Sequence, residues 1–547
     1  MPTQPIGFTG QITSLNMIPL VCVGTVSSAF VYLLGTIIYN VYFHSLRRYP
    51  GPKLWAATRI PYTRSSLSGQ VHRRILELHQ EYGPIVRIAP NELAYNHPDA
   101  WKDVHGHLKN GTGDHGRDPV FTTDTRHSII GANRENHSRF RRALSHGFSA
   151  QSMFDQESII EGYVDLLIRR LHEQCAGEPK ALNMVSWYNW TTFDIIGDLA
   201  FGEPFHCLDE SDYHPWVKMI FDGVKAGAFN MNARRYPLIE RLLMNFVPAD
   251  LQNQRAQHMA LTHEKVQKRL SANFERPDFI GSMLRKKGPG ELTFEELKFN
   301  SSTLITAGSE TTATALSAIT YYILSNTDSL KKLNAEVRNA FASEDDIGMV
   351  SVQKLVYMQA VINEGLRMYP PVPSGIVRRV TDDGGVFLGQ YVPSGKYETL
   401  THPARHLCKF GTGLHTIAPK TSLFLIPSFL NAGLMTLVLQ ATTRMGFNLS
   451  RLDPEIALEE SEYPSSCYPS HVLLSFDCRA NLNLSSSLAY AEMRLILARI
   501  IWNFDMALDE ASRGWDEKSQ VYLLWEKGPV NVFLSPRTIG PEHVTEK

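Results

Sequence analysis

Apolar side chains recur every three to four positions along most of this chain, the spacing that places them on one face of an α-helix. Short alternating runs, typical of strands, occupy much less of it. The pattern predicts helices over residues 70–82, 157–175, 188–200, 215–226, 258–273, 294–325, 352–368 and 488–504. It predicts strands over residues 85–95 (with a turn at Pro90-Asn91), 521–525 and 530–534. We therefore expect a mainly α fold with small β-sheets.

The N-terminal segment has a different character. No residue from 17 to 43 carries a formal charge, and the run is long enough to cross a bilayer as a helix. Arg47 and Arg48 follow it directly, so the positive-inside rule predicts residues 1–16 outside the cytosol, a membrane anchor at 17–43 and a cytosolic domain at 44–547. A cleaved secretory signal is the alternative, although no Lys or Arg precedes Met17, as such a signal would require.

Composition excludes several classes of function. The formal net charge is −1, which gives no basic surface for a nucleic acid. The six cysteines are scattered without close pairs, which argues against a disulfide framework and against a zinc site. No Gly-x-Ser-x-Gly sequence, the usual nucleophile turn of a soluble hydrolase, is present.

The long apolar helix predicted at 294–325 contains the sequence Ala-Gly-Ser-Glu-Thr-Thr at 307–312. Ala307 and Gly308 are small enough for a flat ligand to approach the helix backbone. Glu310 and Thr311 are polar in an apolar setting, so they need partners or a function. The structural alternative is a close helix contact in which the hydroxyls bond back to the preceding turn.

A second motif, Glu-Gly-Leu-Arg at 364–367, ends the helix predicted at 352–368. Glu364 and Arg367 lie three positions apart, so they share one helix face and can form an ion pair. The Tyr-Pro-Pro sequence at 369–371 then prevents the helix from continuing.

Together, these two motifs resemble those of the cytochrome P-450 (haem-thiolate monooxygenase) superfamily, fungal microsomal type. The resemblance implies the cytochrome P-450 fold with an N-terminal transmembrane helix and haem b bound through a Cys thiolate. It places Ala307 and Gly308 over the haem, makes Thr311 the oxygen-activating threonine, and gives Glu310 a part in proton delivery. It makes Glu364 and Arg367 a buried structural pair.

The same resemblance implies three residues that bind the haem propionates. His137 and Arg141, at spacing i and i+4 on a basic helix, match a His or Trp and an Arg that reach the propionates. The alternative for this helix is a solvated charge cluster. Arg378 matches an arginine on a strand that binds a propionate, and Arg379 is the adjacent candidate.

The cysteine loop that should hold the iron is not found. Counted back from Leu488, the ligand position falls on Asn483, which supplies no thiolate. The nearest thiol is Cys478, which lies too early in the chain, although Phe476 stands where the loop's Phe belongs. The whole segment 396–487 is aberrant relative to the family, and the uncharged run 421–443 within it could by length be a second membrane span.

Three explanations remain open for this segment. A misread exon or retained intron would account for an inconsistency confined to one stretch. A true frameshift in a decayed gene is the second, and ligation by Cys478 through a remodelled loop is the third.

The implied activity is insertion of one oxygen atom from O2 into a C–H bond or double bond of a lipophilic small molecule, in fungal secondary metabolism. The implied partners are the endoplasmic reticulum membrane and an NADPH-cytochrome reductase that supplies electrons. The alternative is a membrane-anchored, non-catalytic relic or scaffold of the same fold, which would hold no haem.

Overall fold

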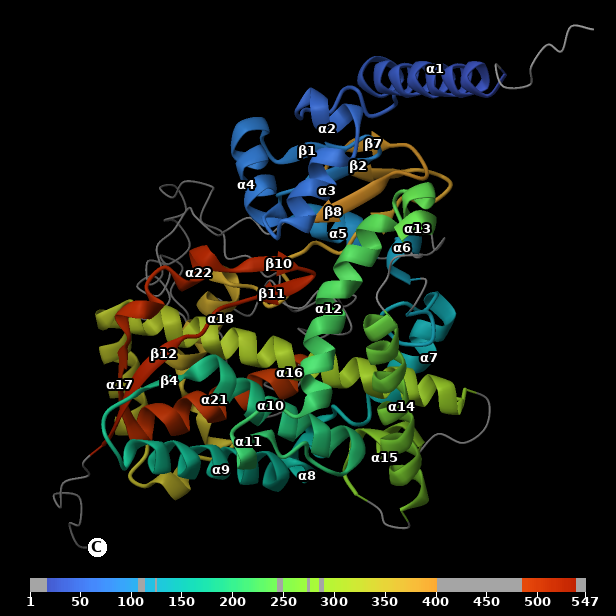
Figure 1. Cartoon of the computed structure of the whole chain (residues 1–547). Helices are drawn as coiled ribbons and strands as arrows, with labels where there is room; N and C mark the ends of the chain where they lie inside the picture. The colour runs from blue at the N-terminus through green and yellow to red at the C-terminus, as the bar shows by residue number, and fades with distance from the viewer. Residues whose placement is uncertain are drawn as a thin grey trace, which may run out of the picture.

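The computed structural model describes residues 17–106, 114–122, 125–243, 249–272, 276–284, 290–400 and 485–537. Helices dominate these residues, as the apolar periodicity predicts, and small sheets lie at their margins (Figure 1). The helices are α1 (Met17–Ile38), α2 (Lys53–Ala57), α3 (Ile60–Leu67), α4 (Val71–Tyr82), α5 (Ala100–His105), α6 (Pro119–Thr122), α7 (Arg134–Leu144), α8 (Ala150–Asp155), α9 (Glu157–Cys175), α10 (Met184–Phe201), α11 (Cys207–Glu210), α12 (Pro215–Ala233), α13 (Pro237–Leu243), α14 (Ala249–Ser271), α15 (Phe279–Leu284), α16 (Phe294–Leu324), α17 (Thr327–Ala340), α18 (Val356–Met368), α21 (Ser485–Asn503) and α22 (Trp515–Lys518).

The described strands form one five-stranded sheet and three smaller ones. The strands are β1 (Ile85–Ala89), β2 (Glu92–Tyr95), β3 (Gly116–Arg117), β4 (Ala181–Asn183), β5 (Arg378–Arg379), β6 (Gly385–Phe387), β7 (Gln390–Val392), β8 (Tyr397–Leu400), β9 (Phe504–Leu508), β10 (Gln520–Tyr522), β11 (Leu524–Glu526) and β12 (Asn531–Pro536). The larger sheet has the order β1-β2-β8-β5-β3, and β2 and β8 pair in parallel. It lies on the side of the molecule nearest α1 (Figure 1).

The C-terminal strands differ from the sequence prediction in one respect. Residues 521–525, predicted as one strand, fold into the hairpin of β10 and β11, which turns at Leu523. Leu523 has φ of 74°, a backbone conformation that a leucine rarely adopts and that its sequence therefore does not indicate. Residues of the hairpin line a cavity together with residues of α12 and α16, which is described below.

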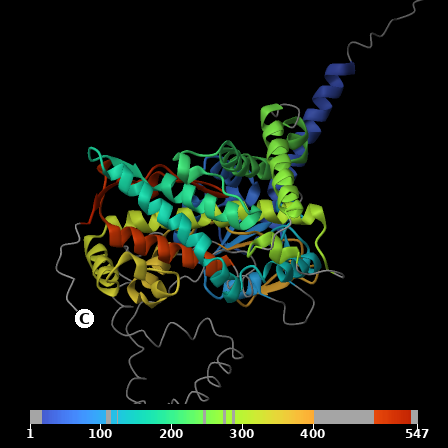
Figure 2. The same cartoon turned by 90° about the horizontal axis from the view of Figure 1, so that it is seen from below.

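Helix α16 is the central element of the fold. Thr293 begins it with a capping box, since its hydroxyl accepts from the Glu296 amide while the Glu296 carboxylate accepts from the Thr293 amide. From Ser309 to Ile323 every residue of the helix is buried, because α10, α18 and α21 cover it on different sides. The helix thereby crosses the whole helical body (Figures 1 and 2).

A glycine allows α18 to lie close to α16. A Cβ atom at Gly365 would collide with Cγ1 of the buried Ile319. We expect Gly365→Ala to lower the free energy of unfolding by about 1–3 kcal/mol, the usual effect of overpacking a core. Gly162, an exposed glycine of α9 with no neighbouring atom within 4 Å of such a Cβ, is the matched control.

Gly162→Ala should leave the free energy of unfolding unchanged or raise it by up to about 1 kcal/mol, since alanine favours the helix. Urea unfolding of both variants checks the prediction. Equal effects of the two substitutions would contradict the close packing of α18 on α16.

The apolar N-terminal segment forms α1 and then a short π-helical stretch, Tyr39–Phe43. The helix stands away from the body of the protein, and the residues from 21 to 43 that could cross a membrane are not buried against it (Figure 2). Length, apolar composition and lack of protein cover make this helix a candidate membrane anchor.

The C-terminal end of the anchor is fixed to the domain. The buried Arg87 guanidinium donates to the carbonyl oxygen of Asn40 (3.0 Å) and to that of Pro90 (2.6 and 3.1 Å). The Asn40 amide in turn donates to the Ala57 carbonyl (2.9 Å). Burial lowers the pKa of Arg87 to about 10, because removal from water disfavours the charged guanidinium. A helix end with such contacts has a defined direction relative to the domain.

Candidate functional site

The N-terminal half of α16 is only partly covered by protein, up to Gly308. Thr303, Leu304, Ala307 and Gly308 are half-buried, whereas the helix is fully buried from Ser309 onward. These positions, together with Thr311, lie on adjoining rows of the helix surface. The predicted cofactor-facing residues Ala307 and Thr311 therefore share one side of α16.

The hydroxyl groups of this stretch bond back to the helix. Thr311 Oγ1 donates to the Ala307 carbonyl (2.6 Å), and Thr312 Oγ1 donates to the Gly308 carbonyl (3.1 Å). This is the arrangement that the structural alternative predicts. It leaves the lone pairs of Thr311 Oγ1 as acceptors, and a short rotation of the hydroxyl frees its hydrogen.

Gly308 has a packing reason to be glycine. A Cβ atom there would lie 2.7 Å from Cδ1 of Ile196 on α10. Close contact between α10 and α16 thus explains the small residue at 308, which sequence reasoning assigned to the approach of a flat ligand. Ala307 remains the small side chain of the uncovered stretch.

Glu310 is buried and forms an ion pair with Lys527. Both side chains are only 4% exposed, and Lys527 Nζ contacts Glu310 Oε1. The Thr314 hydroxyl donates to the same oxygen (3.1 Å). A buried carboxylate requires such partners. Sequence reasoning identified the need but not Lys527, which follows β11 and lies 217 positions away.

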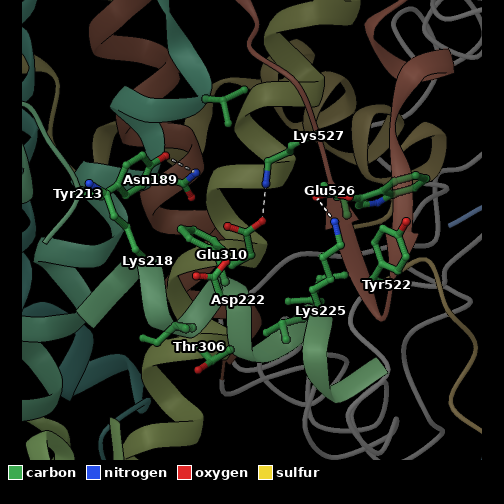
Figure 3. Close-up of a pocket in the computed structure, with 16 residues that line it drawn as sticks. Asn189, Tyr213, Lys218, Asp222, Lys225, Thr306, Glu310, Tyr522, Glu526 and Lys527 are labelled. Atoms are coloured by element: carbon green, nitrogen blue, oxygen red, sulfur yellow. Dashed lines mark hydrogen bonds and ion pairs between the residues drawn. The ribbon is translucent and has the colours of Figure 1, made fainter. Parts of the chain in front are cut away.

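A cavity of about 490 Å³ lies beside this ion pair (Figure 3). It is bounded by α10, α12, α16 and the β10–β11 hairpin. At its edge Lys225 of α12 pairs with Glu526 of β11 (2.6 Å), and both side chains are about half exposed. The adjacent residues Glu526 and Lys527 thus bind two different helices.

A second buried acid lies behind α16. Glu492 of α21 is 2% exposed, and burial raises its pKa to about 8 although the Thr312 side chain hydrogen-bonds it. It is therefore protonated at neutral pH. Glu492 is the one acidic residue of α21, but the amphipathic pattern of this helix does not indicate that it is buried.

Glu364 and Arg367 form the bidentate pair that their spacing predicts. Arg367 donates through Nε to Glu364 Oε2 (2.7 Å) and through Nη2 to Glu364 Oε1 (2.8 Å). The side chains are 6% and 12% exposed. The pair therefore lies inside the fold, at the end of α18.

The predicted propionate-binding residues come from two elements. His137 and Arg141 are half-buried on α7, and Arg139 of the same helix pairs with Glu296 (2.9 Å) and thereby attaches α7 to the start of α16. Arg378 is buried on β5 and donates to His105 Nδ1 (3.0 Å), whereas Arg379 is exposed. Of the two neighbouring candidates, Arg378 faces the interior.

Comparison with known proteins decides the family. A family model described as Cytochrome P450 matches residues 49–397. This chain belongs to the cytochrome P-450 family. It is 43% identical over 515 residues to "Trichothecene C-15 hydroxylase" of Fusarium sporotrichioides, across 93% of this chain and 97% of that protein.

Two other fungal relatives are similar over nearly their whole length. "Cytochrome P450 monooxygenase astJ" of Aspergillus oryzae is 38% identical, across 93% of this P-450 and 96% of that protein. "Averantin hydroxylase" of Dothistroma septosporum is 36% identical, across 97% of this P-450 and 95% of that protein. The chain is thus an enzyme of the cytochrome P-450 monooxygenase type, of the kind found in fungal secondary metabolism.

The residues described in this P-450 fit a haem on one side. They include the half-buried stretch of α16 and the basic side chains of His137, Arg141 and Arg378, whose binding of the two carboxylates stays a prediction. Cys478 and Asn483, the candidates for the iron ligand position, both lie outside the described residues.

The described cysteines lie elsewhere in the fold. Cys22 is in the anchor, Cys175 contacts the Leu534 carbonyl (3.5 Å), and the buried Cys207 accepts from the His214 amide (3.4 Å). No group of three metal-ligating side chains occurs within the part of the chain that the structure describes.

Proposed function

We propose that this P-450 oxygenates a lipophilic small molecule at the face of α16 formed by Ala307 and Thr311. The observation that carries this proposal is the half-buried stretch of α16 that ends at Ala307 and Gly308, with the buried Glu310 directly after it. The relatives named "Trichothecene C-15 hydroxylase" and "Averantin hydroxylase" support a small-molecule substrate of fungal secondary metabolism.

Haem b, when bound, supplies the oxidising chemistry, and the protein supplies position and protons. Ala307 leaves room for a flat group, and His137, Arg141 and Arg378 bind its carboxylates. Thr311 Oγ1, already bonded to the Ala307 carbonyl, accepts or passes a hydrogen bond at the reacting face. Glu310 holds a proton in transit, and Lys527 positions its carboxylate.

The anchor supports a location at the endoplasmic reticulum, with the domain in the cytosol. Arg47 and Arg48 follow the apolar helix, as the positive-inside rule requires for a cytosolic domain. Electrons would then come from NADPH through a membrane reductase on the same surface, and a lipophilic substrate would arrive from the bilayer.

For the iron ligand we propose that the natural protein has a cysteine at the position of Asn483. The family match ends at Tyr397, close to the start of the aberrant segment 396–487, and the helical pattern recovers at Leu488. A misread exon or retained intron in this segment accounts for both observations.

Sequencing the mature transcript across codons 395–488, together with the haem content of the purified full-length protein, tests the proposal. A transcript with a Phe-x-x-Gly-x-x-x-Cys loop joined to Leu488, and a protein with one equivalent of haem-thiolate, is the expected result. A transcript identical to the printed sequence and a protein without haem would refute the activity and leave a relic of the family.

A further inference from the structure

Two buried acceptor atoms beside the cavity have no hydrogen-bond partner among the described residues. They are Oε2 of Glu310 and Oδ1 of Asn189. Both residues line the cavity and are 3% exposed (Figure 3). Glu310 uses its other oxygen for Lys527 and Thr314, and Asn189 uses its amide nitrogen for the Tyr213 hydroxyl (3.2 Å). Buried acceptors of this kind require a donor.

A donor that enters the cavity can reach the carboxylate. The terminal torsion of a Glu side chain is soft, so a rotation of the Glu310 carboxylate turns Oε2 toward the cavity. The Lys527 ammonium group has three N–H donors, and one of them donates to Glu310 Oε1. The pair therefore offers an acceptor and a donor at the same point.

The charges around the cavity favour a neutral ligand. Three cationic side chains and three anionic ones line it: Lys218, Lys225, Lys527, Asp222, Glu310 and Glu526. A ligand with a net charge would gain little from this balanced set. The remaining walls include the apolar side chains of Val185, Ile220, Phe221, Leu524 and Trp525.

We propose that the cavity binds the hydroxyl group of a neutral, already hydroxylated lipophilic molecule. The hydroxyl donates to Glu310 Oε2 and accepts from Lys527 Nζ, while the apolar walls hold the hydrocarbon skeleton. The volume of about 490 Å³ is within the usual range for small-molecule sites.

As a statement about substrate, this inference rests on the proposed function. It names the substrate class as alcohols that an earlier oxygenation or reduction must supply.

The test uses rigid probes that differ at one group: 1-adamantanol, 1-methyladamantane and 1-methoxyadamantane. The methyl compound has the shape of the alcohol, and the ether keeps the acceptor but lacks the donor. Binding to the full-length protein in nanodiscs is measured by ligand-observed NMR. We expect the alcohol to bind at least about tenfold more tightly than either analogue.

Variants then test whether the preference for the alcohol arises at Glu310 and Lys527. Glu310→Gln and Lys527→Met should each abolish the preference for the alcohol, and Lys527→Arg should restore part of it. Lys218→Met, at a side chain 58% exposed on the cavity edge, is the control and should keep the preference. Equal binding of the three probes, or an unchanged preference in Glu310→Gln and Lys527→Met, would overturn the inference.

The binding measurement needs neither haem nor oxygen, so the two proposals fail separately. Haem-loaded protein with no preference for the alcohol overturns the cavity assignment alone. Protein that lacks haem but keeps the preference overturns the oxygenase proposal and leaves a binding site. Circular dichroism of each variant verifies folding, and the two positions provide independent tests if one variant does not fold.

Discussion

Replacing Arg367 by alanine is expected to lower the free energy of unfolding by about 3–5 kcal/mol, the usual effect of breaking a buried ion pair. The substitution removes both donors from Glu364, whose side chain is only 6% exposed, and leaves its charge uncompensated inside the fold. Urea unfolding of the full-length protein in detergent measures the change as a lower transition midpoint.

The chain offers a matched control with the same spacing. Arg74 and Glu77 of α4 also form an i, i+3 pair (2.5 Å), but the two side chains are 49% and 57% exposed. Arg74→Ala should change the free energy of unfolding by less than about 1 kcal/mol.

A double variant isolates the cause. Glu364→Leu combined with Arg367→Met should recover most of the loss, because an apolar pair leaves no buried charge. If Arg367→Ala behaves like Arg74→Ala, the pair has no structural role.

The second large effect concerns pH. Glu492→Gln is expected to make the protein more stable than the wild type at pH 9, by up to about 5 kcal/mol, and equally stable or nearly so at pH 4. Glutamine has the shape of the protonated acid and cannot ionise. Because burial raises the pKa of Glu492 from 4.5 to about 8, the native state resists losing this proton.

The sign follows from the two protonation states. Between pH 4.5 and about 8 the unfolded chain releases the proton of Glu492 and the folded protein keeps it, so stability falls as the pH rises through this window. Above pH 8 both states are ionised and the loss is constant. Other groups titrate alike in both proteins, so the difference between their unfolding midpoints against pH isolates Glu492. A difference that does not change with pH would show that the acid is solvated.

Much of the fold could be predicted because it depends on local pattern. The helix predicted at 157–175 is α9 with the same bounds, and that predicted at 294–325 is α16 to within one residue. Both have a clear apolar period and well-marked ends. Glu364 and Arg367 were recognised for the same reason, because their contact is set by helix geometry.

The partners of the buried acids could not be predicted, because tertiary packing brings them together. Lys527 meets Glu310 only after the β10–β11 hairpin turns at Leu523, and that turn has no sequence signal. Thr312 and Glu492 meet because α21 lies against α16. The periodicity of one helix contains no information about what a residue on another helix will touch.

The propionate-binding roles of His137, Arg141 and Arg378 remain predictions. The structure adds that Arg378 is buried and that Arg139, between the two α7 residues, is already paired with Glu296. The i, i+4 spacing from His137 distinguishes Arg141 within the basic run, but it does not indicate that Arg139 pairs with Glu296.

The Arg87 contact with Asn40 determines where the candidate membrane anchor ends and the folded domain begins. Asn40 belongs to the apolar run by sequence, yet its carbonyl and amide complete the hydrogen bonding of the domain interior. A soluble version made by deleting the whole run would leave a buried guanidinium facing an empty site. A truncation that keeps the last turn of the stalk would keep the domain intact, and the same rigid joint would set the tilt of the domain over the lipid headgroups.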